Sequence, residues 1–166
     1  MGSPPEAVID ALARFGGVAR RFEHRGAAAG VEFVDDYAHL PTEVATTIRA
    51  CRSGSWSRLV AVFQPHRYSR TESLAASFAE AFDGADVVYV TEVFPAGESP
   101  RPGVTGRLVA DAVRASRPGT DVRYEPRRDE LVAGLVEELR EGDLCLTMGA
   151  GDLTSVPDEV RNRLEV

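Results

Sequence analysis

The amino-acid sequence predicts an α/β fold, specifically a Rossmann-like three-layer sandwich with a mostly parallel sheet of about six strands and an N-terminal hairpin. Short apolar runs alternate along the chain with stretches whose apolar residues recur at helical spacing. Strands that alternate with helices form parallel sheets that are covered on both faces. The chain has 166 residues, 43% of them hydrophobic and 27% charged, which suits one globular domain.

The chain opens with an amphipathic pattern. Apolar residues recur at helical spacing between Pro5 and Gly16, and the pair Gly16-Gly17 ends the pattern. We therefore expect residues 1–17 to form a linker helix or the remnant of a preceding domain, and residues 18–166 to form the domain itself.

The remaining elements follow from turn signals and periodicity. A turn over residues 26–30 separates two strand-like segments and predicts the hairpin. The continuous apolar run 59–63 is typical of a strand buried on both faces. Pro41 favours the first turn of one helix, and Thr71 can cap the next. The expected strands are 20–25, 31–34, 59–63, 86–90, 122–124 and 144–147, and the expected helices begin near residues 41, 71, 105, 131 and 157.

The charge pattern excludes several classes of function. A net charge of −7 argues against a non-specific nucleic-acid binder. All 19 basic residues are arginine, so the chain has no lysine for a P-loop or a Schiff base. No apolar run approaches the roughly 20 residues of a membrane-spanning helix, and the N-terminus does not resemble a signal peptide. We therefore expect a cytoplasmic protein without membrane or nucleic-acid partners.

Polar residues cluster where four of the expected parallel strands end. Ligands of an open α/β sheet bind outside the carboxyl ends of its strands. Two loops supply the candidate binding residues, which are Tyr37, His39, His66, Arg67 and Arg70. A guanidinium pair can hold a carboxylate or a phosphate. The expected wall of the cleft consists of Asp35, Asp36, Gly149, Gly151 and Asp152.

Each candidate also has a structural interpretation. His66 could cap the following helix, and Arg67 and Arg70 could pair with surface carboxylates such as Glu72. Four polar loops at one sheet edge nevertheless favour a binding site.

Other motifs favour structural roles. The Gly149-Ala150-Gly151 motif lacks the third glycine of a dinucleotide fingerprint, which favours a tight turn. The Asp35-Asp36 pair has no third hard ligand nearby, so hydrogen bonding at a strand end is expected and no metal site is assigned. We expect Cys51 and Cys145 to be small residues of the hydrophobic core. We expect His24 to have a structural role in the hairpin.

Four segments together resemble a known family. Segments 17–23, 35–43, 63–71 and 148–152 are similar to the C-terminal domain of the Mur ligases, in the branch that joins L-alanine to UDP-N-acetylmuramate during peptidoglycan synthesis. The resemblance covers nearly the whole chain from about Gly16, and the histidine-arginine-tyrosine sequence at 66–68 is its specific part. Related ligases that recycle whole tripeptides share the aspartate-rich loop but differ after the third strand.

The resemblance implies a three-domain enzyme of which this chain is one part. In the family, an N-terminal domain holds the UDP-sugar and a central ATPase domain carries the P-loop and the magnesium ligands. The C-terminal domain closes over ATP and receives the amino acid. ATP and Mg²⁺ would then be cofactors of the full-length enzyme, with neither bound tightly by this chain alone. The γ-phosphoryl group of ATP activates the lactoyl carboxylate, and the amine of L-alanine attacks the acyl phosphate.

The resemblance also implies roles for the candidate residues. Arg67 and Arg70 would hold the alanine carboxylate or offset charge on the phosphates. Tyr37, His39 and His66 would line the same cleft and orient the amine or ATP. The segment 149–152 would form the far wall, and no residue is assigned a catalytic role.

One position departs from the family pattern. Leu40 stands where the family often has a second histidine, which leaves His39 as the candidate in that loop. Leu40 also lacks the side-chain oxygen of a good helix cap.

We therefore expect the amino-acid-accepting domain of an ATP-dependent ligase, and we do not expect the isolated chain to form an amide bond. The alternatives are a free-standing, non-catalytic binding module and the C-terminal domain of a tripeptide-recycling ligase. An unrelated Rossmann-type enzyme is disfavoured because its glycine motif would follow the first strand rather than the last.

Overall fold

The computed structural model describes residues 18–165, so the expected linker helix over 1–17 lies outside the described residues. None of the helices within residues 18–165 combines the length and the apolar character that a membrane span requires. The elements in chain order are β1 (Glu23–Ala28), β2 (Val31–Asp36), α2 (Pro41–Cys51), β3 (Arg58–Phe63), α3 (Tyr68–Leu74), the 3₁₀ helix η1 (Ala75–Phe78), β4 (Val87–Val90), α4 (Arg107–Ser116), β5 (Asp121–Tyr124), α5 (Arg128–Glu138), β6 (Asp143–Met148), the 3₁₀ helix η2 (Asp152–Ser155) and α6 (Val156–Leu164).

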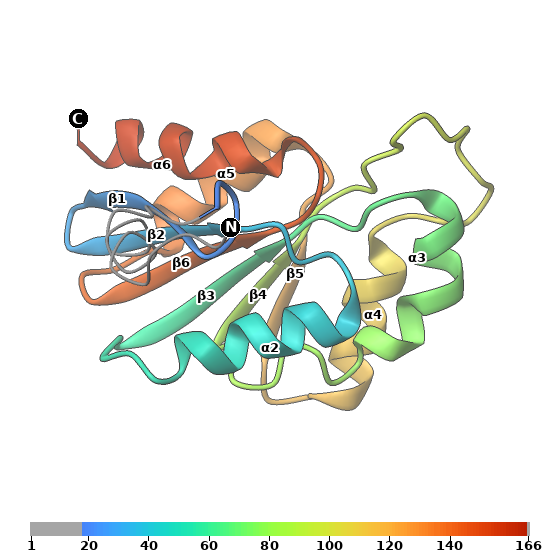
Figure 1. Cartoon of the computed structure of the whole chain (residues 1–166), viewed down its shortest axis with the longest axis horizontal. Coiled ribbons are helices and arrows are strands. Elements are labelled where there is room, and N and C mark those ends of the chain that lie inside the picture. The colour runs from blue at the N-terminus through green and yellow to red at the C-terminus, as the bar shows by residue number, and fades with distance from the viewer. Residues whose placement is uncertain (1–17, 166) are drawn as a thin grey trace, which may run out of the picture.

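The six strands form one sheet in the order β1-β2-β6-β3-β4-β5. Strand β1 pairs antiparallel to β2, and every other pair is parallel. Helices α5 and α6 cover one face, whereas α2, α3 and α4 cover the other (Figure 1). The expected α/β sandwich with its N-terminal hairpin is confirmed. Because β2, β6, β3 and β4 are parallel neighbours, the loops that follow them gather at one edge.

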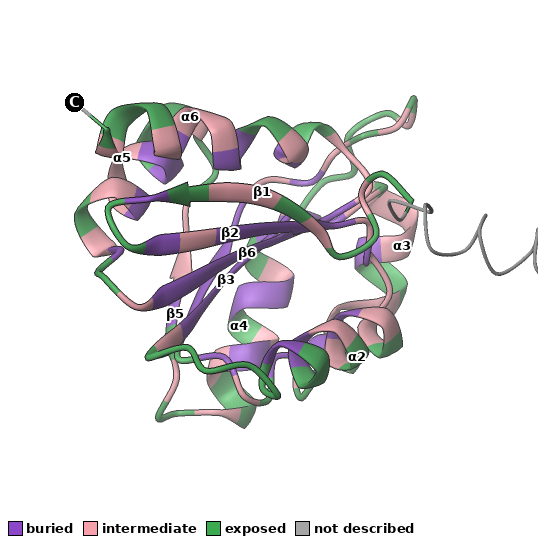
Figure 2. Cartoon of the chain, turned by 60° about the vertical axis from the view of Figure 1, so that its left-hand side comes forward, coloured by how far each residue is buried: buried purple, intermediate pink, exposed green. Residues whose placement is uncertain are grey.

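The core lies in two layers, one on each face of the sheet. Leu59, Ala61 and Phe63 pack in the layer under α2 and α4, whereas Val60 and Val62 pack in the layer under α5 and α6. This alternation explains why β3 reads as a continuous apolar run. The central strands are buried along their length (Figure 2).

The two cysteines belong to this core. Cys51, the last residue of α2, faces the core layer between that helix and the sheet, and Cys145 of β6 lies in the layer on the opposite face. Burial raises the pKa of each thiol to about 12. Both side chains are therefore neutral packing groups, as the sequence predicts.

The hairpin differs from its predicted bounds. Strand β1 begins at Glu23 rather than at residue 20, and it runs into the expected turn as far as Ala28. The chain reverses at Ala29 and Gly30, whose φ angles of 50° and 77° fit a two-residue turn. Gly26 lies at an irregularity in the pairing between β1 and β2. Residues 18–22 are left outside the sheet and are free to contact the site.

Thr71 does not cap the helix that follows β3, contrary to the prediction from the sequence. Helix α3 begins at Tyr68, so Thr71 lies inside it, and the Thr71 hydroxyl donates to the carbonyl oxygen of Arg67 at 2.8 Å. The carboxylate of Glu98 supports the start of the helix instead, because it accepts from the Ser69 hydroxyl at 2.5 Å and from the Ser69 amide at 2.9 Å. These hydrogen bonds lower the pKa of Glu98.

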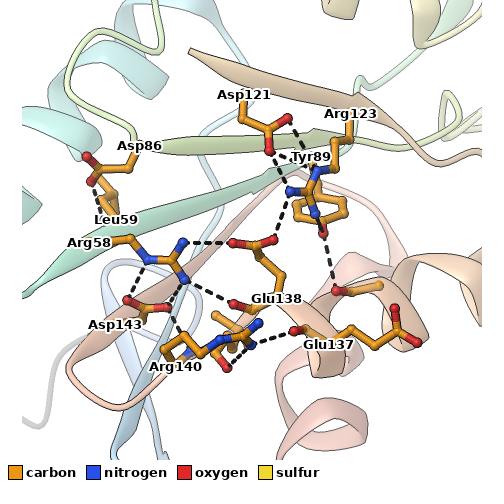
Figure 3. Close-up of polar contacts among 12 residues, drawn as sticks. Arg58, Leu59, Asp86, Tyr89, Asp121, Arg123, Glu137, Glu138, Arg140 and Asp143 are labelled. Atoms are coloured by element: carbon orange, nitrogen blue, oxygen red, sulfur yellow. Dashed lines mark hydrogen bonds and ion pairs between the residues drawn. The ribbon is translucent and has the colours of Figure 1, made fainter. Parts of the chain in front are cut away.

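An ionic network fixes the opposite edge of the sheet, where β3 and β6 begin. The Arg58 guanidinium donates to both carboxylate oxygens of Asp143, with N–O distances of 3.0 and 2.6 Å. It also donates to Glu138 at 2.7 Å. The other oxygen of Glu138 lies 2.8 Å from Arg123 (Figure 3). The network holds α5 against the sheet, away from the polar loops.

Candidate functional site

Side chains from the loop after β2, the loop after β3 and the first turn of α3 meet at the edge of the sheet where the parallel strands end. We call them the rim cluster: Tyr37 and His39 from the first loop, His66 from the second, and Arg70, which lies in α3 rather than in a loop. The His39 ring lies 5.4 Å from the Tyr37 ring and 5.7 Å from the His66 ring, between centroids. Nη1 of Arg70 lies 3.4 Å from Nδ1 of His66. The loops meet because β2 and β3 both flank β6 in the sheet.

The loop after β3 is held by the loop after β4. The His66 ring stacks on Phe94, with centroids 5.6 Å apart and planes inclined by 20°. The amide of Arg67 donates to the carbonyl oxygen of Phe94, and the amide of Phe94 donates to that of Pro65, both at 2.8 Å. Arg67 adopts a φ of 69°, which is unusual for a non-glycine residue. The hydrogen bonds on both sides sustain this conformation.

Asp35, one of the residues expected in the wall of the cleft, is a buried hydrogen-bond acceptor. Its side chain is 0% exposed. Its Oδ1 accepts from the Thr147 hydroxyl at 2.7 Å. Its Oδ2 accepts from the Thr154 hydroxyl at 2.8 Å and from Nε of Arg20 at 3.1 Å. These contacts match the hydrogen-bonding role that the sequence favours over metal binding.

Asp36 and Glu43 organise the loop that carries Tyr37 and His39. Asp36 is buried and accepts from the amides of Phe22 and Ala38 at 2.7 and 2.8 Å. Glu43 accepts from the amide of His39 at 3.0 Å and from that of Leu40 at 3.1 Å. Glu43 thus reaches back to the start of α2, where Leu40 offers no side-chain acceptor.

The glycine-rich turn after β6 packs directly against the loop after β3. A Cβ atom on Gly149 would lie 3.1 Å from the carbonyl oxygen of Gln64. On Gly151 it would lie 2.4 Å from Oε1 of Gln64 and 2.5 Å from the Phe94 ring. Asp152 accepts from the Gln64 amide group at 2.8 Å. Close packing, consistent with a tight turn, therefore accounts for both glycines.

Arg20 and Arg21 also lie beside Tyr37, although neither was among the residues expected at the site. Their guanidinium carbons lie 5.1 and 5.3 Å from the centroid of the Tyr37 ring. Arg20 also donates to the carbonyl oxygen of Gly149 at 2.6 Å. Both arginines precede β1, whereas the position of the other site residues was predictable because they follow strands. The segment 17–23 nevertheless matches the family pattern. That family match was the signal that could have identified both arginines.

Three arginines near the rim cluster have no carboxylate within ion-pair distance among the described residues. Arg67 and Arg70 form no ion pair within residues 18–165, and neither does Arg21. Many arginines elsewhere do form such pairs, as Arg25 does with Asp158 and Arg128 with Glu159. The three guanidiniums near the rim cluster keep donors that an anion could use, although Glu43 and Glu98 lie close enough to Arg21 and Arg67 for their charges to interact.

We expect His66 to titrate below its ordinary pKa of 6.5. Burial lowers the pKa of His66, and the positive charges of Arg70, His39 and Arg67 lower it further, against the opposing effect of Glu98. The contribution of neutral His66 to folding is therefore present above pH 6.5 and is lost as the pH falls through the folded-state value. An NMR titration of the imidazole resonances measures this, and Arg70→Ala should raise the pKa. A midpoint above 6.5 would contradict the geometry.

The chain has clear relatives among known proteins. The family described as "Mur ligase, glutamate ligase domain" matches residues 20–151. The chain is 52% identical over 165 residues to a UDP-N-acetylmuramate–L-alanine ligase of Kineococcus radiotolerans, covering 99% of this chain and 35% of the relative. A ligase of the same name from Myxococcus xanthus is 49% identical over 160 residues, covering 96% and 34%.

Solved structures share the fold. The UDP-N-acetylmuramate-alanine ligase of Thermotoga maritima matches with a TM-score of 0.72 and 26% identity, covering 95% of this chain and 35% of that one. A domain from a Haemophilus ducreyi ligase, at 23% identity and a TM-score of 0.61, covers 87% of this chain and 99% of that one.

The chain spans about a third of the length of the curated relatives it matches. Within that third, the match includes the segments that carry the rim cluster, the glycine-rich turn and the arginines beside Tyr37. The chain thus belongs to the Mur ligase family and constitutes a Mur ligase C-terminal domain.

Proposed function

We propose that this chain is the amino-acid-accepting domain of the ATP-dependent ligase that joins L-alanine to UDP-N-acetylmuramate in cytoplasmic peptidoglycan synthesis. The observation that carries the proposal is the pair of guanidiniums at the carboxyl edge, Arg67 and Arg70, which form no ion pair with a described residue. The chain is about 50% identical to proteins that are named as ligases of this activity, and this similarity supports the choice of substrate.

The incoming amino acid brings a carboxylate that the two arginines can bind. A guanidinium matches a carboxylate or a phosphate through two parallel hydrogen bonds. Arg70 lies in the rim cluster and is half-buried, so a hydrogen bond from it competes with little water. Arg67 is exposed and can reach either the amino acid or a phosphate. Together they would position the amino acid for attack on the acyl phosphate.

His66 would add a hydrogen-bond donor to the same cluster. A guanidinium has donors only, so Nδ1 of His66 acts as the acceptor in its contact with Arg70. The neutral ring then carries its proton on Nε2. That N–H group, like the guanidiniums, suits an anionic oxygen. Tyr37 and His39 would enclose the amino acid from the side of β2.

ATP would supply the phosphoryl group that activates the lactoyl carboxylate. The chain has no lysine, and residues 18–165 contain no group of three His, Cys, Asp or Glu side chains placed to hold a metal ion. We therefore assign the magnesium ligands and the P-loop to the central domain, and the UDP-sugar site to the N-terminal domain. The residues of this chain fit the narrower task of neutralising and positioning anions.

An ATP-dependent ligation assay tests the proposal. The full-length ligase that carries this domain should join L-alanine to UDP-N-acetylmuramate, whereas the 166-residue chain alone should form no amide. The same assay with a tripeptide in place of L-alanine checks the recycling alternative. Robust turnover by the isolated chain, or a full-length enzyme that uses only the tripeptide, would refute the proposal.

A further inference from the structure

We propose that Thr154 is a positioning residue of this site, whose hydroxyl orients Asp35 and, through Asp35, the Arg20 guanidinium beside Tyr37. The inference rests on the proposed function and extends it to a residue in η2. The side-chain hydrogen bonds of Thr154 within residues 18–165 go to Asp35 and Arg25 and not to the rim cluster, so its effect would pass through other side chains.

The direction of the Thr154 hydroxyl follows from its two neighbours. Its Oγ1 lies 2.8 Å from Oδ2 of Asp35 and 3.3 Å from Nη1 of Arg25. Arg25 can only donate, so the hydroxyl accepts from Arg25 and must direct its own hydrogen at Asp35. Asp158 of α6 pairs with Arg25 and holds that guanidinium in place.

The two oxygens of Asp35 have separate partners. Oδ1 receives the Thr147 hydroxyl, whereas Oδ2 is shared by the Thr154 hydroxyl and Nε of Arg20. The carboxylate is fully buried, so water cannot readily replace a lost donor. Without the Thr154 hydroxyl, Oδ2 would keep Arg20 as its one partner among residues 18–165, and the carboxylate would be less well oriented.

Arg20 connects the Asp35 carboxylate to Tyr37 on one side and to the glycine-rich turn after β6 on the other. Its guanidinium donates to the carbonyl oxygen of Gly149 and lies against the Tyr37 ring. Its own carbonyl oxygen accepts from the Tyr37 amide at 2.7 Å. A displacement of Arg20 would therefore shift Tyr37 and the glycine-rich turn together. The polar contacts run without a break from Asp158 through Arg25, Thr154, Asp35 and Arg20 to Tyr37.

Kinetics of the full-length ligase that carries this domain test the inference. Thr154→Val keeps the shape of the side chain and removes the donor, whereas Thr154→Ser keeps the hydroxyl. We expect Thr154→Val to raise the KM for L-alanine about tenfold, with kcat per folded enzyme within about twofold of wild type, because a misplaced Tyr37 weakens binding before and during the reaction alike. Thr154→Ser should restore the wild-type KM.

A merely structural role would give a different result. It would reduce the amount of folded enzyme and so lower the measured rate at an unchanged KM. A wild-type KM in Thr154→Val, or an equally raised KM in Thr154→Ser, overturns the inference. If Thr154→Val does not fold, Arg25→Gln removes the group that orients the hydroxyl, and we expect an increase of about threefold in KM. An unchanged KM in Arg25→Gln would also contradict the inference.

Two further measurements separate this inference from the proposed function. If the wild-type ligase is inactive or Arg70→Ala leaves its kinetics unchanged, the proposed function fails. If Arg70→Ala impairs the ligase and Thr154→Val does not, only the role of Thr154 fails.

Hydrogen exchange in the 166-residue chain tests the positioning role directly. The Tyr37 amide should exchange about tenfold faster in Thr154→Val than in Thr154→Ser. Equal exchange rates in the two variants would overturn the positioning role.

Discussion

Arg70→Ala is expected to lower kcat/KM of the full-length ligase by about 10- to 100-fold, mainly through a higher KM for L-alanine. Hydrogen bonds to a charged group contribute about 1.5–3 kcal/mol, and about 1.4 kcal/mol corresponds to a factor of ten. Arg70 has no carboxylate partner among the described residues and lies beside His66. Initial rates at varied L-alanine concentrations measure the effect.

Two further variants test whether the effect of Arg70→Ala comes from the guanidinium at this position. Arg70→Lys keeps the charge but loses the paired donors, so it should recover only part of the activity. Arg163→Ala removes an exposed guanidinium of α6, on a helix that does not contribute to the rim cluster, and should leave the kinetics unchanged. Wild-type kinetics in Arg70→Ala would remove Arg70 from the site.

Arg58→Ala is expected to lower the free energy of unfolding by about 3 kcal/mol, because it leaves a buried carboxylate without its cation. The Asp143 side chain is 1% exposed and receives two hydrogen bonds from Arg58. Glu138 loses one of its two arginine partners in the same variant (Figure 3). Arg58 is itself 32% exposed, which keeps the loss near the lower end of the usual range.

Urea unfolding followed by the fluorescence of Trp56, the single tryptophan, measures this loss. Arg127→Ala is a matched control, since its ion pair with Asp129 is 65% exposed on both sides. That variant should change the free energy of unfolding by less than about 0.5 kcal/mol. Equal losses in the two variants would contradict the distinction between buried and exposed pairs.

The fold was predictable because its signals are local. The apolar runs of β3 and β6 and the helical spacing in α2 and α5 indicate their elements within a few residues of the observed ends. The position of Tyr37, His39, His66 and Arg70 after parallel strands was enough to place them at one edge. Their roles in binding stay predictions.

The missed features depend on contacts between distant parts of the chain. Arg20 finds its partners 15 residues away at Asp35 and 129 residues away at Gly149. The start of β1 and the contacts of residues 18–22 follow from these partners, which no local pattern reveals. The prediction that Thr71 caps the helix was wrong because α3 begins three residues earlier, where Glu98 from a separate loop accepts hydrogen bonds from Ser69.

The most direct test of the binding site is a crystal structure of the full-length ligase with its UDP-N-acetylmuramoyl-L-alanine product. The carboxylate of the alanine residue should lie within hydrogen-bond distance of Arg67 or Arg70, with Tyr37 and His66 beside it. A structure in which groups of the other domains hold that carboxylate, and both guanidiniums face solvent, would contradict the account.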